Sequence, residues 1–172
     1  MALIEKHGFD EIKRKIANGG GGVPERVMLR RLHKLGLDMT THARTVTPGH
    51  SSGGYNDQTG NLRSSIGYRI YRDGVPVEDG GFKGGYGAEG GAKGEAGAKS
   101  ALNLYSLPQG YEKGWTIVIV AGMSYASAVE SGHRKTRNGR YYEAKGYNVL
   151  KLTGDELKKR VQEMQDEING KN

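Results

Sequence analysis

The chain has 172 residues, a formal net charge of +7 and no cysteine. This length suits one domain with a hydrophobic core, and the absence of cysteine excludes a disulfide framework and a Cys-based zinc site. No apolar run approaches the ~20 residues that a membrane span needs, and the N-terminus lacks the apolar region of a signal peptide. We therefore expect a cytoplasmic product without a membrane partner, whose positive charge favours contact with a polyanion.

Residues 1–22 are predicted to form a short N-terminal helix followed by a glycine hinge. Phe9, Ile12 and Ile16 recur at helical spacing, and Asn18 precedes four glycines. Residues 23–172 are predicted to form a single domain with insertions at 49–58 and 80–99.

A long amphipathic helix is predicted to begin near Pro24, because proline suits the first helical turn. Its apolar positions recur at steps of three and four: Met28, Leu32, Leu35, Met39, Ala43 and Val46. Its other face is basic and carries Arg26, Arg30, Arg31, Lys34 and Arg44. Pro48 ends the helix, and the polar residues 49–58 form the first insertion.

Strands are predicted in the middle of the chain. A capped turn over 59–65 leads into Ile66, Tyr68 and Ile70, which alternate with other residues as in a half-buried strand. Asp73-Gly74 is typical of a hairpin turn, after which residues 75–78 return as a strand. The β-branched run 115–121 indicates a central strand. Residues 80–99 contain nine glycines, so we expect a mobile surface insertion there.

Two further helices are predicted in the C-terminal half. The first spans 124–130 with Ser124 as its N-cap. The second begins with the capping box formed by Thr153 and Glu156, and its apolar positions are Leu157, Val161, Met164 and Ile168. The predicted fold class is α+β, with an antiparallel sheet packed against the long helix, a C-terminal amphipathic helix and a glycine-rich insertion.

Motifs for catalysis are weak. Residues 122–126 resemble a hydrolase nucleophile elbow around Ser124, but only His133 follows as a candidate base, and helix capping explains Ser124 better. Residues 85–90 match the dinucleotide-binding pattern without the strand and helix that such a site requires. Glu130 and His133 have metal-site spacing but lack a second pair of ligands. We therefore predict no catalytic, metal or cofactor site.

A basic and aromatic segment offers a candidate surface for phosphates or for another subunit. It comprises Arg134, Lys135, Arg137, Arg140 and Tyr141. The helical cations Arg30, Arg31 and Lys34 are further candidates, although such residues usually form a solvated helix face. Lys and Arg neutralise phosphates, and tyrosine rings stack on bases.

Two segments together resemble a known family. Thr47-Pro48, then residues 59–66, then residues 125–132 after an apolar strand are similar to the neck or tail-completion proteins of long-tailed bacteriophages. The positions that carry the resemblance are Thr59, Gly60, Leu62, Ser65, Ile66, Tyr125, Ala126, Val129, Glu130 and Gly132. In that family Thr-Pro and Thr-Gly are nearly adjacent, so residues 49–58 correspond to an insertion.

The resemblance implies a non-enzymatic virion protein of the phage neck or tail. Such minor tail or head–tail connector components form homo-oligomeric rings around the DNA channel. The implied partners are other copies, other neck, connector or tail proteins and non-specific DNA, and the implied locations are the host cytoplasm during assembly and then the virion. A nucleic-acid-binding accessory protein that uses residues 134–142 is the alternative, and a small hydrolase is a third.

The motif residues also have local physical roles. Thr59 is expected to cap a turn, Gly60 to adopt a backbone angle that other residues avoid, and Leu62 to anchor the turn in the core. Gly132 suits the position after a helix, and Val129 is expected to pack inward. Glu130 has no evident local role, so we expect it to pair with an Arg or Lys of a neighbouring subunit.

Overall fold

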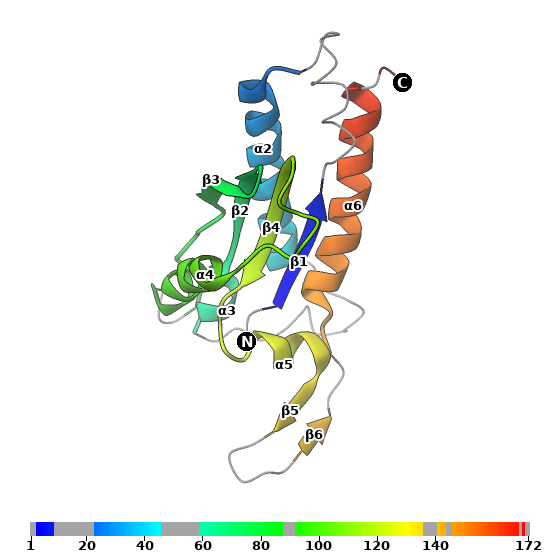
Figure 1. The fold of residues 1–172 in the computed structure, drawn as a ribbon. Coiled ribbons are helices and arrows are strands. Elements are labelled where there is room, and N and C mark those ends of the chain that lie inside the picture. Colours follow the sequence, from blue (N-terminus) through cyan, green and yellow to red (C-terminus); the bar gives the residue numbers. More distant parts are fainter. Residues whose placement is uncertain are drawn as a thin grey trace.

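A computed structural model describes residues 3–8, 23–45, 59–87, 92–135, 141–143, 146–168 and 170 of the chain. Helix α2 (Glu25–Thr45) and helix α6 (Val149–Ile168) pack against each other and against one face of a β-sheet, and helix α4 (Ala92–Leu104) packs on the other face (Figure 1). The predicted α+β class is confirmed.

The sheet has four antiparallel strands in the order β1-β4-β2-β3: β1 (Leu3–Gly8), β4 (Trp115–Ala121), β2 (Ile66–Arg72) and β3 (Val75–Gly80). Strand β4 is buried along its whole length and pairs with β1 on one side and β2 on the other. A strand that is covered on both faces needs apolar side chains at every position. The prediction of a central strand at 115–121 is therefore confirmed.

Alternate residues of β4 serve two separate cores. Ile117 and Ile119 join the larger core with the buried apolar face of α2, including Leu32, whereas Val118 and Val120 face α4. The predicted buried positions of the long helix from Met28 to Ala43 are confirmed, and Val46 lies outside the described residues.

Strands β2 and β3 are joined by the predicted Asp-Gly turn. Both turn residues have positive φ, 50° at Asp73 and 81° at Gly74, which suits the right-handed twist of a hairpin. Asp73 also accepts a hydrogen bond from the Gly114 amide at 2.9 Å, which joins this turn to the chain before β4. Strand β3 lies at the edge of the sheet, contains Pro76, and leaves Val75 61% exposed.

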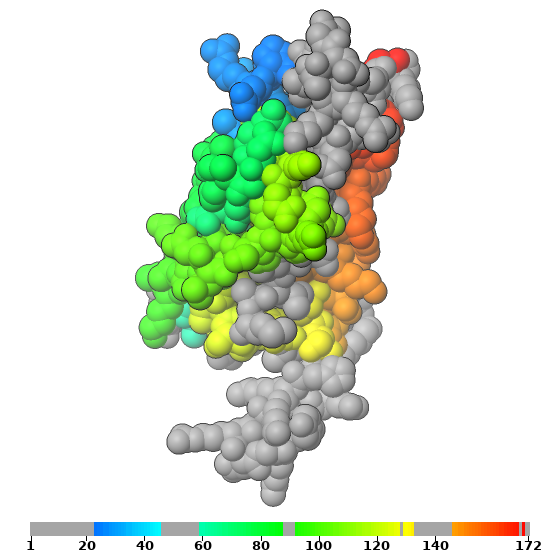
Figure 2. Space-filling view, viewed as in Figure 1, coloured from blue at the N-terminus to red at the C-terminus, as the bar shows by residue number. Residues whose placement is uncertain are grey.

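Helix α4 corrects the prediction of a mobile insertion at 80–99. The helix packs on β2 and β4, where Ala98 and Leu102 are fully buried, and it forms a continuous surface with the β2–β3 segment in Figure 2. Its small residues permit close approach, because a Cβ atom at Gly94 would lie 2.0 Å from the Asn61 carbonyl oxygen. The prediction was wrong because it considered only the small number of apolar side chains in this segment. Close packing between backbones is not visible in the composition.

The start of α6 differs from the prediction. The helix begins at Val149, so Thr153 lies within it and is no N-cap. The Thr153 hydroxyl is fully buried and donates to the Val149 carbonyl oxygen at 2.7 Å, a bond that a hydroxyl within a helix commonly makes. The resemblance to a capping box was misleading because the apolar face of the helix extends back to Val149 and Leu150.

Strand β1 was not predicted. Leu3–Gly8 pairs with β4, which places this stretch in the sheet of the main domain, whereas residues 1–22 were assigned to a separate helix and hinge. The predicted helix at 9–16, the glycine hinge and the insertion at 49–58 lie outside the described residues. An edge strand is held by backbone pairing, and this one has no alternating apolar pattern to reveal it.

Substitution of Gly94 tests the packing of α4. Gly94→Ala should lower the free energy of unfolding by about 1–3 kcal/mol, because the added methyl group collides with the Asn61 carbonyl. Urea denaturation followed by circular dichroism measures the change. The control is Ser100→Ala at an exposed position of the same helix, which should change stability by less than ~0.5 kcal/mol. A Gly94→Ala protein as stable as the wild type would contradict the packed arrangement.

Candidate functional site

The first motif segment forms a tight turn that enters β2. The Thr59 hydroxyl accepts a hydrogen bond from the Asn61 amide at 3.3 Å, and Gly60 has a φ of 75° before the short helix α3 (Asn61–Ser64). A Cβ atom at Gly60 would lie 1.6 Å from the Tyr86 carbonyl oxygen, so glycine is required there. The predicted roles of Thr59, Gly60 and Leu62, which is buried, are confirmed.

The second motif segment packs against the first. It contains helix α5 (Ala126–Ser131), and its residues Ala126, Val129 and Glu130 line the same small cavity as Leu62 and Ile66 of the first segment. Just before the second segment, the Gly122 amide donates to the Ser65 carbonyl oxygen at 2.9 Å. Ser65 also donates its hydroxyl to the Leu62 carbonyl oxygen at 2.7 Å. Segments that lie about sixty positions apart in the sequence therefore form one junction with the end of β4.

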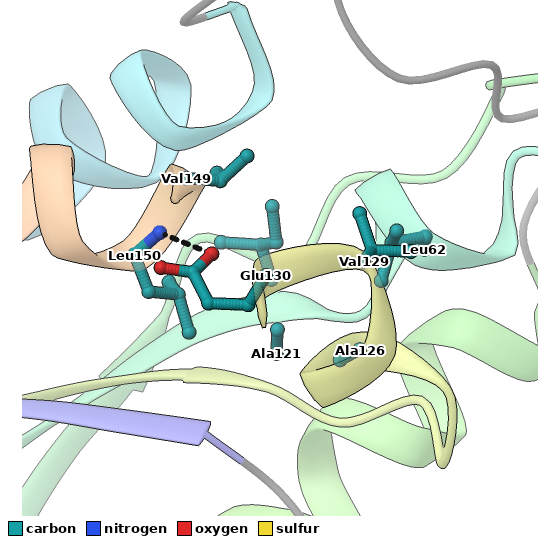
Figure 3. A pocket seen from close by; sticks show the side chains of 8 residues that line it. Leu62, Ala121, Ala126, Val129, Glu130, Val149 and Leu150 are labelled. Atoms are coloured by element: carbon teal, nitrogen blue, oxygen red, sulfur yellow. Dashed lines mark hydrogen bonds between the residues drawn. The ribbon is translucent and has the colours of Figure 1, made fainter. Parts of the chain in front are cut away.

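A small cavity lies within this junction (Figure 3). Its volume is about 20 Å³, which holds about one water molecule. It is lined by Leu62, Ile66, Ala121, Ala126, Val129, Glu130, Val149 and Leu150. Val129 packs against the larger core, as predicted. The cavity is too small for a substrate.

Glu130 has a structural role that corrects its prediction as an intersubunit residue. Its side chain is buried, and one of its oxygens accepts a hydrogen bond from the Leu150 amide at 3.0 Å (Figure 3). The other oxygen accepts from the Lys151 amide at 2.9 Å, so both bonds come from the first amides of α6. The first amides of a helix lack partners within the helix and carry a partial positive charge. Glu130 therefore caps α6 from twenty residues upstream, which its own neighbourhood in the sequence does not reveal.

Two points of the chain are fixed at α5. One is where the chain leaves α5, and the other is where it returns to α5 before it enters α6. Gly132 follows α5 with a φ of 75°, as predicted for that position. The returning chain donates from the Tyr147 amide to the Val129 carbonyl oxygen at 2.9 Å and from the Asn148 amide to the Glu130 carbonyl oxygen at 3.1 Å. Glu130 therefore binds the returning chain with both its backbone and its side chain.

The environment of Ser124 differs from that of a hydrolase nucleophile. Ser124 and Tyr125 lie exposed in the turn between β4 and α5. The described strands of the main sheet are all antiparallel, whereas a nucleophile elbow belongs to a parallel sheet. His133 lies in strand β5 (His133–Lys135), beyond the end of α5.

Helix α4 begins at Ala92, shortly after the glycine-rich pattern at 85–90, contrary to the prediction that no helix follows. The preceding strand β3 ends at Gly80 and is largely exposed, so no apolar strand leads into the pattern, as predicted. The N-terminus of α4 is nevertheless occupied, because the Gly94 amide donates to Asn61 Oδ1 at 3.2 Å. This contact takes up one of the amides that a phosphate group would use.

The basic residues of α2 divide into three groups. Arg26, Arg30 and Lys34 are exposed, whereas Arg31 lies 3.5 Å from Glu167 of α6. Arg44 is buried and does not belong to the basic face, which corrects its prediction. Its guanidinium donates to the carbonyl oxygens of Arg63 at 3.0 Å, Ile66 at 2.6 Å and Gly81, and so joins α2 to α3, β2 and the chain after β3.

The predicted basic and aromatic segment contains a second small sheet. Arg134 and Lys135 lie in β5, and Tyr141 begins strand β6 (Tyr141–Glu143), which pairs antiparallel with β5. Arg137 and Arg140 lie outside the described residues.

A polar cluster between α2 and β3 was not predicted. His33 Nδ1 lies 2.7 Å from the Tyr68 hydroxyl and 2.5 Å from Glu78 Oε1. Burial raises the pKa of the Tyr68 hydroxyl above its ordinary value, and the negative charges of Glu78 and Asp79 raise it further, so it stays protonated at neutral pH. The cluster links α2 to the sheet, and a lone histidine on a helix gives no sign of it.

Within the described ranges, no three His, Asp or Glu side chains are grouped so that they hold a metal ion. No helix among these residues has both the length and the apolar character needed to cross a membrane. Comparisons of the chain with protein families, with curated proteins and with solved structures found no match.

Substitution of Glu130 tests its role as a cap. Glu130→Ala should lower the free energy of unfolding by about 1.5–3 kcal/mol, because the amides of Leu150 and Lys151 lose a charged acceptor. Hydrogen exchange at those two amides should accelerate, and Glu130→Gln should give a smaller loss because it keeps one acceptor oxygen.

The control for this substitution is Glu163→Ala on the exposed face of α6. Glu163 lies 3.9 Å from Lys159, and loss of such a surface pair should change stability by less than ~0.5 kcal/mol. Equal stability of the Glu130→Ala and Glu163→Ala proteins would show that the cap contributes nothing.

Proposed function

We propose that this chain is a structural component of the neck or tail of a long-tailed bacteriophage, and that it assembles as a ring around the DNA channel. The observation that carries the proposal is the junction of the two motif segments. Residues 59–66 and 125–132 carry the resemblance to that family, and residues of both segments line one small cavity at the end of β4.

The motif residues define a fold. Gly60 and Gly132 adopt positive φ, Leu62 and Ala126 are buried, and Glu130 caps α6. Motif residues that together shape one junction indicate that proteins with this motif share a fold. Related structural subunits have such a shared fold in common. The cavity at this junction has room for about one water molecule, so the motif residues around it do not form a substrate site.

Charge supports a position close to DNA. The chain carries a net charge of +7, and Arg30 and Lys34 are exposed one turn apart on α2. Positive residues beside a channel would reduce repulsion between packed phosphates and a protein wall. The proposed location is therefore the virion, with the host cytoplasm as the place of assembly.

The oligomeric state tests this proposal. The purified full chain should form closed rings with an axial hole, because identical subunits joined head to tail close into rings when the rotation between them permits. Sedimentation velocity over a wide range of protein concentration measures the state, and electron microscopy shows the hole. A chain that stays monomeric at every concentration and is absent from purified virions would overturn the proposal.

A further inference from the structure

Three cations line one exposed face of α2. Arg26, Arg30 and Lys34 follow each other at steps of four residues, and all three side chains are exposed. Residues four apart on an α-helix differ in direction by about 40°, so the three positions lie within an arc of about 80° and span about 12 Å. These three residues form the cationic stripe of α2, and the first turns of this helix (blue) lie at the molecular surface in Figure 2.

The carboxylates that are closest to the stripe in the sequence have other neighbours. Glu25 lies 3.5 Å from Arg72 of β2. The pKa of Arg160 on α6 is raised by its hydrogen bond to Glu156 and, more weakly, by the negative charge of Asp38. Within the part of the chain that the structure describes, none of the three stripe cations has a carboxylate oxygen within 4.0 Å.

The stripe differs from the charge pattern of the other helices. On α6, Arg160 lies 2.8 Å from Glu156, one turn away. On α4, Lys99 lies 2.8 Å from Glu95, again one turn away. Opposite charges at this spacing stabilise a helix, and solvated helix faces usually combine the two signs in this way. Exposure to solvent alone therefore does not account for the stripe.

The stripe is unfavourable for its own helix. Like charges one turn apart repel each other, and this occurs between Arg26 and Arg30 and again between Arg30 and Lys34. Arg26 also lies in the first turn of α2, where the helix carries a partial positive charge. Residues that break such local rules are expected at functional surfaces, where a partner supplies the compensating contact. The stripe therefore indicates an anionic partner.

The chemistry of α2 favours double-stranded DNA among anionic partners. A duplex carries one negative charge per about 1.7 Å of its axis, so a stripe of about 12 Å faces several phosphates. Helix α2 contains no Phe, Tyr or Trp, whereas proteins that hold single strands stack the bases on aromatic rings. The apolar face of α2 is buried in the larger core, so it is not available to insert into a lipid surface.

We propose that the cationic stripe of α2 binds the phosphate backbone of double-stranded DNA without reading its sequence, and that Arg26, Arg30 and Lys34 neutralise phosphates. Phosphate contacts position a protein on DNA and carry no sequence information. This inference rests on the proposed function and deepens it, because it names the surface of the subunit that faces the DNA channel.

The test measures binding of the full chain to a labelled DNA duplex as a function of salt. Arg30→Gln with Lys34→Gln should weaken binding by about 10- to 100-fold at ~0.1 M salt and should reduce the salt slope by about 2 for each chain in contact with the DNA, because each phosphate contact contributes about 0.9. The matched control is Lys158→Gln with Lys159→Gln, which removes the same charge from the exposed face of α6 and should leave the slope close to that of the wild type.

Stability separates a binding role from a structural one. Arg30→Gln removes both like-charge repulsions of the stripe. The thermal midpoint of the Arg30→Gln, Lys34→Gln protein should therefore equal that of the wild type or exceed it by about 1–3 °C at low salt. A variant that loses DNA binding while it keeps this stability would support the inference. A clearly lower midpoint would make the stripe a structural element and overturn it.

Three binding results would also overturn the inference. The first is a wild type that shows no salt-dependent binding of the duplex. The second is an equal loss of binding in the stripe variant and in the α6 control. The third is a wild type that binds a single-stranded oligonucleotide more tightly than a duplex of the same length.

Sedimentation velocity separates this inference from the proposed function. Wild-type rings whose DNA binding does not depend on the stripe would keep the ring and overturn the inference. A monomeric wild type whose DNA binding depends on the stripe would overturn the ring and support the DNA contact. Loss of the oligomer in the stripe variant would make the stripe a subunit contact and overturn the inference.

Discussion

The bonds from Glu130 to the start of α6 are the interaction on which the C-terminal half of the structure depends. Helix α6 begins with amides that have no partner in their own helix, and a buried carboxylate from α5 accepts two of them. The attraction is mutual, because the buried negative charge also needs donors. Since the Glu130 backbone also holds Asn148, one residue fixes where the chain leaves α5 and where it enters α6.

The two faces of the sheet are packed in different ways. Large aliphatic side chains of α2 fill one face, and Tyr68 lies beneath Gly36, where a Cβ atom would approach the ring to 2.8 Å. On the other face, α4 lies so close that a Cβ atom at Gly122 would be 2.2 Å from the Gly97 backbone. These close backbone contacts of α4 exclude larger residues but bury little apolar surface. They therefore fix the position of α4 more than they stabilise it.

The elements that were predicted from the sequence are those with a strong local pattern. Strand β4 is continuously β-branched, α2 has a long apolar stripe, and the Asp73-Gly74 turn has one preferred conformation. The motif turn at Gly60 was also predicted correctly, because its residue types determine its backbone.

The features that were missed depend on distant partners. Helix α4 is formed of small residues whose packing depends on Asn61, and the cap of α6 comes from Glu130. Arg44 has the spacing of an exposed cation, but three carbonyl oxygens from separate segments surround its guanidinium. A single sequence gives no information about such long-range contacts, so they are identified only in the folded structure.

The outer edge of β3 limits how this protein associates with itself. An edge strand offers unpaired backbone groups to any other strand, and uncontrolled pairing leads to fibres. In β3, Pro76 has no amide hydrogen to donate, and Glu78 and Asp79 place two carboxylates on the same strand. Addition of a further strand to this edge of the sheet is therefore discouraged, so crowding of many copies does not by itself lead to pairing of β3 with another strand.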